Sequence, residues 1–360
     1  MATKIRIKAA KKSRVSEVDF DNIPFGRVFS DHMFVAEYKG GKWKNARIIP
    51  FGEFKIHPAN MGLHYGQSIF EGMKASKNQD GVPCLFRPEM HSQRINASAA
   101  RMCMPAFPEK LFIDALNELL SLDADWIPTN PGSSLYIRPL MFASENHIGV
   151  AVAQEYTFMI MTGPVGPYYT KPVRLIVENQ YVRAVDGGVG EAKTAGNYAA
   201  SLLPAKLAKD KGYDQVMWMD AKEFKYIQEA GTMNLVFVID GKVVTPIADG
   251  SILKGITLNT FKHILKSKNI LFEERLLSID ELVEAYKAGK LQEVFGAGTA
   301  AVVSHVSEVT YKDFTMVLPP IETRTIGNML YNEINGLRNG TVEDTYGWLH
   351  PVKSKMLELA

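Results

Sequence analysis

The sequence predicts a two-domain protein of the α/β class, with strands and helices mixed in each half (α+β). The chain has 360 residues, 46% of them hydrophobic, and a chain of this length ordinarily forms more than one core. Strand-like and helix-like segments interleave in both halves, without a long βαβ array. Gly163 and the segment 164–172 together hold two glycines and three prolines. We therefore expect a smaller N-terminal domain at 1–163, a connector at 164–172 and a larger C-terminal domain at 173–360.

The first half is expected to open with strands and hairpins. The Gly-Gly pair at 40–41 and the Asn-Gln-Asp-Gly run at 78–81 predict hairpin turns. Runs rich in β-branched and aromatic residues predict strands at 28–38, 43–50, 68–77, 82–86, 134–142 and 156–162. Apolar residues at helical spacing predict helices at 90–104, which ends before Pro105, and at 109–122.

The second half alternates strands and helices more evenly. The same reasoning predicts strands at 173–177, 215–219, 234–240 and 242–246. Helices are predicted at 197–211, 255–267 and 279–287, and residues 331–337 belong to the last clear helix. The first of these helices is followed by Gly212, a residue that commonly ends helices.

Composition excludes several classes of partner. A net charge of +2, from 41 basic and 39 acidic residues, gives no electrostatic basis for binding nucleic acid or an anionic membrane. No apolar run is long enough to span a bilayer, and the histidines show no metal-ligand spacing. Cys84 and Cys103 both have apolar neighbours, so we expect both to be packed inside a protein of a reducing compartment. These observations predict a soluble, cytoplasmic protein without a metal site.

Lys193 is the first candidate for chemistry. It stands among small residues in the stretch GEAKTAGNY at 190–198, where something bulky could approach the backbone. A neutral lysine is a nucleophile that forms Schiff bases with carbonyls, and an aldehyde cofactor such as pyridoxal 5'-phosphate is its commonest dedicated partner. A solvated lysine in a glycine-rich turn is the alternative, and from this stretch alone it is the commoner case.

The sequence also holds candidates for the other groups that such a cofactor needs. Glu229, in a turn before a strand, could hold the pyridine nitrogen protonated, although a surface glutamate is the alternative. Residues 253–257 precede a predicted helix and could cradle a phosphate, or could form an ordinary helix start capped by Thr257. A second turn of small residues, at 296–300, has a tight strand-to-strand bend as its alternative. The candidate arginines are Arg87, Arg94, Arg101 and Arg138, the last of which interrupts a buried-looking strand.

Six ordered motifs, taken together, resemble those of the branched-chain amino acid aminotransferases, which are fold-type IV pyridoxal phosphate enzymes. The resemblance extends from about Phe25 to Trp348. The motifs are FG…DHM at 25–33, LHY…FEGMK at 63–74, YIRP at 136–139, GGVG…K…GNY at 187–198, EAGTMN at 229–234 and FGAGTA at 295–300.

This resemblance implies a two-domain fold with the cofactor at the domain interface, and a homodimer. It implies that Lys193 forms the Schiff base with pyridoxal 5'-phosphate and moves the substrate proton. Glu229 matches the partner of the pyridine nitrogen, and Tyr198 matches the phenol near the ring hydroxyl. The phosphate contacts match Arg94, Ile256, Thr257 and Thr299.

The resemblance also implies a substrate pocket that accepts leucine, isoleucine or valine and also glutamate. Arg138 and Tyr136 match residues that meet the acidic side chain of glutamate. Tyr65, Phe70 and the loop around Val150 match positions near the subunit contact. The full set of implied substrate residues is Phe25, Tyr65, Phe70, Tyr136, Arg138, Tyr168, Thr232, Met233, Thr299 and Ala300.

The implied activity is amino-group transfer between these amino acids and 2-oxoglutarate by a ping-pong mechanism. Three rivals stay open: a D-amino acid transaminase, an aminodeoxychorismate lyase and a non-catalytic pyridoxal-binding protein. The intact set of Lys193, Glu229 and Tyr198 argues against the last. Mammalian members of the family carry a Cys-x-x-Cys pair where this chain has Ala301 and Ser304, so we expect no thiol redox switch.

Overall fold

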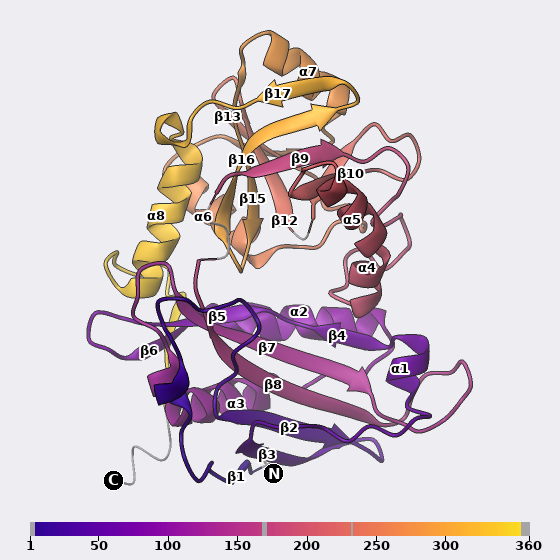
Figure 1. Cartoon of the computed structure of the whole chain (residues 1–360), viewed down its shortest axis with the longest axis vertical. Coiled ribbons are helices and arrows are strands. Elements are labelled where there is room, and N and C mark those ends of the chain that lie inside the picture. The colour runs from indigo at the N-terminus through magenta and orange to yellow at the C-terminus, as the bar shows by residue number, and fades with distance from the viewer. Residues whose placement is uncertain (1–3, 168–170, 232, 354–360) are drawn as a thin grey trace. The chain divides into compact units, whose positions relative to one another are not determined.

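The computed structural model describes residues 4–167, 171–231 and 233–353 (Figure 1). The chain forms two compact units. Unit 1 comprises Met1–Tyr168, Ala192–Ala195 and Asn335–Ala360, and unit 2 comprises Tyr169–Glu191 and Gly196–Ile334. The segment around Lys193 thus packs with unit 1, although the sequence-based division assigned it to 173–360. This segment packs with unit 1 because its backbone is hydrogen-bonded to Ser98 and Phe70 of that unit.

Unit 1 is built on a nine-stranded sheet of order β1-β3-β2-β8-β7-β5-β6-β18, with β4 paired to β7. Its pairings are antiparallel except for β1 with β3. The strands are β1 (Arg6–Ile7), β2 (His32–Tyr38), β3 (Trp43–Pro50), β4 (Ser68–Phe70), β5 (Met73–Lys77), β6 (Pro83–Phe86), β7 (Ser134–Ala143), β8 (Tyr156–Val165) and β18 (Leu349–Pro351). The prediction of one strand at 68–77 was wrong, since the chain forms β4 and β5 with Glu71 and Gly72 between them. The Glu71 N–H still donates to the carbonyl of Pro139 on β7 at 2.9 Å, but Pro139 has no N–H to donate in return.

Three α-helices accompany this sheet: α1 (Met61–Tyr65), α2 (Pro88–Arg101) and α3 (Glu109–Leu122). Helices α2 and α3 contact each other beside the sheet (Figure 1). The predicted apolar stripe of α3 is buried in the core of unit 1, where each large side chain contributes about 1.5–3 kcal/mol. The buried residues of the stripe are Leu111, Phe112, Ala115, Leu116, Leu119 and Leu120.

Unit 2 has a second nine-stranded sheet, of order β11-β10-β9-β16-β15-β12-β13-β14, with β17 paired to β16. An additional pairing of β11 with β12 closes six of these strands into a barrel. One core cluster contains alternate barrel residues, such as Leu235 and Phe237, and residues of helix α7 (Ile279–Lys287). The strands are β9 (Val173–Val177), β10 (Gln215–Met219), β11 (Ile227–Ala230), β12 (Met233–Ile239), β13 (Lys242–Pro246), β14 (Phe272–Arg275), β15 (Leu291–Gly298), β16 (Val302–Tyr311) and β17 (Phe314–Val317).

The helices of the second half are α4 (Ala195–Ala200), α5 (Leu202–Asp210), α6 (Ile256–Ser267), α7 (Ile279–Lys287) and α8 (Ile326–Asn339). The single helix predicted at 197–211 is broken at Ser201. Pro204 explains the break, because its ring clashes with the carbonyl four residues earlier, at Ala200, and it has no N–H to donate. The predicted mixed α/β class is confirmed.

The two cysteines differ in exposure. Cys84 is buried on β6, as expected, but Cys103 is exposed, and the prediction that it would be packed inside was wrong. Cys103 follows the end of α2 with a positive φ of 54°, in a turn where the neighbouring Met104 fills the core instead. Within the described ranges, no helix is both long and apolar enough to cross a membrane.

Candidate active site

Lys193 is held by unit 1 through its own backbone. Its N–H donates to Ser98 Oγ on α2 at 2.9 Å, and its carbonyl accepts from the N–H of Phe70, at the end of β4, at 3.0 Å. Thr194 forms a bridge with Ile69, and its hydroxyl donates to the carbonyl of Ser68 at 2.8 Å. The segment therefore lies along β4 like a short extra strand, which fixes where the lysine side chain begins.

The Lys193 side chain lies in surroundings that favour its neutral form. Burial, together with the positive charge of Arg94, lowers the pKa of Lys193 to about 8, while the negative charge of Glu71 opposes this shift. The ammonium nitrogen lies 4.9 Å from the centre of the Phe70 ring. A lysine with this pKa has a substantial neutral fraction near pH 8, which is what a nucleophile or a proton acceptor requires.

Arg138 shares the Phe70 ring with Lys193. Its guanidinium carbon lies 4.6 Å from the centre of that ring, and its Nη2 donates to the hydroxyl of Tyr136 at 2.9 Å. The Tyr136 ring in turn meets the ring of Phe25 edge to face, with centroids 5.3 Å apart. The Nε of Arg138 is buried without a hydrogen-bond partner among the described residues. This aromatic-lined cation has donor capacity left for an anionic ligand.

Gly72 is required by the close approach of this cluster. A Cβ atom at this position would lie 2.3 Å from the hydroxyl oxygen of Tyr136, far inside van der Waals contact. Any larger residue would displace the Tyr136 hydroxyl and hence the guanidinium of Arg138.

Arg94 is held by a buried carboxylate. Its Nε and Nη2 donate to the two oxygens of Glu71 at 2.6 and 2.8 Å, and His91 Nδ1 lies 2.8 Å from the second oxygen. Burial raises the pKa of Glu71, but the contacts with Arg94 and His91 outweigh it and hold that pKa well below its usual range. The Arg94 side chain is only 12% exposed, so it is held inside unit 1 rather than solvated.

In unit 2, Glu229 on β11 is buried, with 3% of its surface exposed. Its Oε1 accepts from the amide of Asn234 at 3.0 Å and from the N–H of Leu253 at 2.9 Å. Its Oε2 lies 2.9 Å from Nε of Arg183, whose Nη2 donates to the carbonyls of Gly190 and Ser251 at 3.1 and 2.8 Å. The reading of Glu229 as a surface glutamate is excluded, because its carboxylate is buried and accepts from Asn234 and Leu253.

The predicted phosphate cradle begins helix α6. Gly255 is the N-cap, without a side-chain cap, and Ile256 and Thr257 form the first turn, where backbone N–H groups lack helical partners. Thr257 therefore does not cap the helix, and that alternative was wrong. A Cβ atom at Gly255 would lie 1.9 Å from Oδ1 of Asn234, so only glycine fits here without moving the residue that holds Glu229.

The other predicted residues are distributed over both units. Tyr198 lies on α4 with intermediate exposure, and Thr299 and Ala300 form the turn between β15 and β16. Met233 begins β12 and packs beside Gly296 and Gly298 at the end of β15. Tyr65 ends α1 and is 40% exposed. Tyr168 and Thr232 lie outside the described residues.

Several residues that shape the site were not singled out from the sequence. Glu71, His91 and Ser98 hold Arg94 and Lys193, and Arg183 and Asn234 hold Glu229. Glu71 lies in the motif FEGMK and Asn234 in the motif EAGTMN, so the sequence could have indicated both as polar residues at strand ends. His91, Ser98 and Arg183 carry no local signal, because only the tertiary fold brings them to their partners.

Comparisons with known proteins identify the family of this chain. Residues 68–309 match the family model for amino-transferase class IV. Branched-chain-amino-acid aminotransferase 2 of Bacillus subtilis (strain 168) is 45% identical over 349 residues, which cover 96% of this chain and 95% of that protein. A probable branched-chain-amino-acid aminotransferase of Staphylococcus aureus (strain N315) is 48% identical over 329 residues, covering 90% of this chain and 92% of that protein.

The fold of this chain also matches solved structures of branched-chain amino acid aminotransferases. The branched-chain amino acid aminotransferase of Escherichia coli matches with a TM-score of 0.74 at 27% identity, over 90% of this chain and 99% of that one. The branched-chain aminotransferase of the thermophilic archaeon Thermoproteus uzoniensis, solved with norvaline, matches with a TM-score of 0.74 at 25% identity, over 89% and 100%. The chain belongs to the class IV aminotransferases and, within them, to the branched-chain-amino-acid aminotransferases.

Proposed function

We propose that this protein transfers an amino group between leucine, isoleucine or valine and 2-oxoglutarate, with pyridoxal 5'-phosphate as its cofactor. Near full-length similarity to branched-chain-amino-acid aminotransferases supports the reaction class. The structural observation that carries the proposal is the position of Lys193. It has a lowered pKa and shares one aromatic ring with Arg138, a cation suited to a second carboxylate.

The residues of the candidate site fit this cofactor chemically. The amine of Lys193 can react with its aldehyde, and the ionised Glu229 can pair with a protonated pyridine nitrogen. The first turn of α6 offers backbone N–H groups to a phosphate, at a glycine where a Cβ atom would collide with Asn234. When bound, the cofactor supplies an electron sink that stabilises the carbanion left by loss of the substrate's α-proton.

The roles of this chain's own residues follow from their chemistry. Lys193 holds the cofactor and, once released, accepts and returns the proton at its Nζ. Glu229 keeps the pyridine nitrogen charged, supported by Arg183 and Asn234. Tyr198 meets the ring hydroxyl. The phosphate is held by Arg94, Ile256, Thr257 and Thr299.

We propose that the substrate pocket combines an apolar wall with one cation. Arg138 meets the second carboxylate of glutamate, oriented by the hydroxyl of Tyr136. When leucine, isoleucine or valine binds, its side chain contacts the aromatic rings of the pocket. The charge of Arg138 does not face it freely, because the guanidinium lies over the Phe70 ring. The remaining proposed substrate contacts are Phe25, Tyr65, Tyr168, Thr232, Met233, Thr299 and Ala300.

A homodimer is also proposed. Unit 1 exposes several large apolar side chains on α1 and at 148–152, a pattern typical of an interaction surface. They include Leu63 at 66%, Ile148 at 69% and Val150 at 90% exposure. We further propose a cytoplasmic location, in keeping with the two free thiols.

The test of this function is a substrate panel with the purified protein loaded with cofactor. We expect glutamate to form from 2-oxoglutarate with L-leucine, L-isoleucine and L-valine, and not with D-leucine or D-alanine. Turnover of D-alanine, or pyruvate release from aminodeoxychorismate, together with inert L-leucine, would assign the chain to another activity of this fold type.

A further inference from the structure

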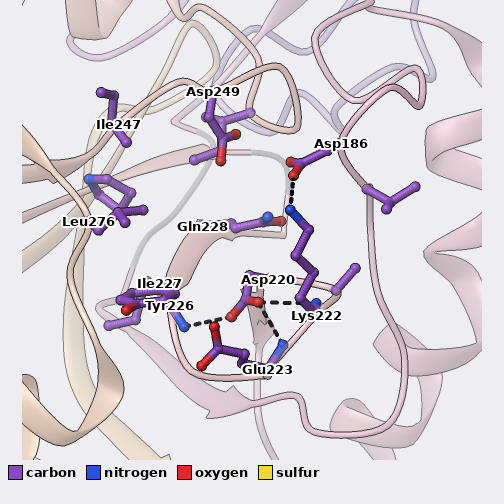
Figure 2. Close-up of a pocket in the computed structure, with 14 residues that line it drawn as sticks. Asp186, Asp220, Lys222, Glu223, Tyr226, Ile227, Gln228, Ile247, Asp249 and Leu276 are labelled. Atoms are coloured by element: carbon purple, nitrogen blue, oxygen red, sulfur yellow. Dashed lines mark hydrogen bonds and ion pairs between the residues drawn. The ribbon is translucent and has the colours of Figure 1, made fainter.

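A pocket lies within unit 2, formed by segments around residues 186, 220–228, 246–252 and 276 (Figure 2). Its volume is about 220 Å³, which is enough for a small organic molecule. Gln228 of β11 lines this pocket, while the next residue, Glu229, belongs to the candidate active site. Successive side chains of a strand point to opposite faces, so Gln228 faces away from the Glu229 site.

Gln228 has an unmet hydrogen-bonding need. Its side chain is only 5% exposed, and its Oε1 accepts no hydrogen bond from the described residues. The amide orientation is fixed, because Nε2 donates to Ser251 Oγ at 2.9 Å and that hydroxyl is already donating to Asp249 Oδ1 at 2.7 Å. A buried acceptor without a donor is unfavourable, so the site favours a ligand that brings an N–H or O–H group.

The charges around the pocket select a cation. Four carboxylates line it, from Asp186, Asp220, Glu223 and Asp249, against one lysine, Lys222. The carboxylate of Asp220 accepts hydrogen bonds from four backbone N–H groups of the turn at 222–226. Lys222 forms an ion pair with Asp186 at 2.7 Å. The carboxylates of Glu223 and Asp249 add two further negative charges, so the lining as a whole is negative and attracts a positively charged ligand.

The opposite wall is apolar. Figure 2 shows Ile247 and Leu276 on one side of Gln228, and the pair of Asp186 and Lys222 on the other, toward which the Gln228 amide points. Ile247 is 42% exposed and Leu276 is 53% exposed, so a ligand would cover apolar surface that is now in contact with water.

We propose that this pocket binds a small molecule that carries a protonated amine on a short aliphatic chain. The ammonium N–H donates to Gln228 Oε1, the acidic rim stabilises its charge, and the aliphatic chain covers Ile247 and Leu276. The site is distinct from the one that holds the transamination chemistry, and it does not depend on the proposed function.

The test uses a tertiary amine, N,N-dimethyl-3-methylbutylamine, because it keeps one N–H and its charge but cannot condense with an aldehyde cofactor. The holoenzyme is first saturated with 4-methylvaleric acid, with which another branched-chain amino acid aminotransferase was crystallised, so that the catalytic site is occupied. Calorimetric titration is expected to show one further site. The quaternary trimethylammonium analogue, which keeps the charge but lacks the N–H, should bind at least about ten-fold more weakly.

Two variants locate the binding. Ile247→Trp fills the pocket from an exposed position and should weaken binding at least about ten-fold, while kcat/KM for leucine stays within about two-fold of wild type. Gln228→Met keeps the side-chain length without the acceptor and should remove the preference for the tertiary amine. Equal binding of the two amines to wild type, absence of heat, or unchanged affinity in Ile247→Trp would each overturn the proposal.

Discussion

Lys193 and Phe70 are joined both through backbone and through side chains. The N–H of Phe70 donates to the carbonyl of Lys193 at 3.0 Å, and the Lys193 ammonium lies 4.9 Å from the Phe70 ring. The residue with the proposed chemistry is thus positioned by the end of strand β4, whose pairing with β7 also brings Arg138 to the same ring. The proposed reactive amine and the proposed substrate-binding cation therefore both lie against the Phe70 ring.

Gly255→Ala should disturb the Glu229 site through packing alone. The backbone φ of Gly255 is −69°, which alanine adopts readily, but its Cβ atom would lie 1.9 Å from Oδ1 of Asn234. We expect a loss of about 1–3 kcal/mol in the free energy of unfolding and at least ten-fold weaker cofactor binding. Gly52→Ala is the matched control, because a Cβ atom there meets nothing within 4 Å. Equal effects of both variants on cofactor affinity would show that the crowding at Asn234 is unimportant.

Arg138→Ala should separate the two half-reactions. The guanidinium is proposed to meet the second carboxylate of glutamate, a contact that leucine cannot make. We expect kcat/KM to fall about 10–100-fold for glutamate and less than ten-fold for leucine, as measured by single half-reactions. Tyr136→Phe, which removes only the hydroxyl that accepts from Arg138, should show the same trend more weakly. Similar losses for glutamate and leucine would make Arg138 a structural residue.

Lys74 should give a distinctive pH dependence of stability. Burial, with the nearby charge of Arg338, lowers its pKa from 10.5 to about 7. Between these values the unfolded chain binds one proton more than the folded chain, so the free energy of unfolding rises with pH, by about 1.4 kcal/mol per unit from this group. The difference between wild type and Lys74→Met in urea denaturation should therefore grow in favour of wild type from pH 7.5 to 9.5.

Lys77→Met is the control for that measurement, because Lys77 lies on the same strand but is partly exposed. Its difference from wild type should stay flat over this pH range. If the difference in the free energy of unfolding between wild type and Lys74→Met is also independent of pH, Lys74 stays protonated in the folded protein from pH 7.5 to 9.5.

Most elements could be predicted from local pattern. The strand β9 and the helices α3 and α7 begin and end where the sequence indicated. The predictions failed where tertiary context decides. Pro204 breaks a helix whose periodicity continues across it, and the barrel closure through β11 depends on pairings that no local pattern reports.

The residues of the candidate site also fall into two groups, those that the sequence singled out and those that it did not. Lys193 and Arg138 were singled out because each is unusual where it stands: an amine among small residues and a charge within an apolar strand. Glu229, expected in a turn before a strand, became a candidate only as the acid that a pyridine nitrogen needs and through the family resemblance. Arg183 and His91 were missed, since their surroundings become informative only when the fold brings them to Glu229 and Glu71. Ion pairs between distant segments leave no trace in a single sequence.

We propose that Lys193, and no other lysine, carries the cofactor. Lys74 is the sharpest rival, because its side chain is buried and its pKa is likewise lowered, to about 7. The most direct measurement is borohydride reduction of the holoenzyme followed by peptide mass spectrometry. We expect the cofactor mass on the peptide that contains Lys193, and no label in Lys193→Ala, while Lys206→Ala on exposed α5 behaves as wild type. Label on the Lys74 peptide, or full labelling and leucine turnover in Lys193→Ala, would contradict the claim.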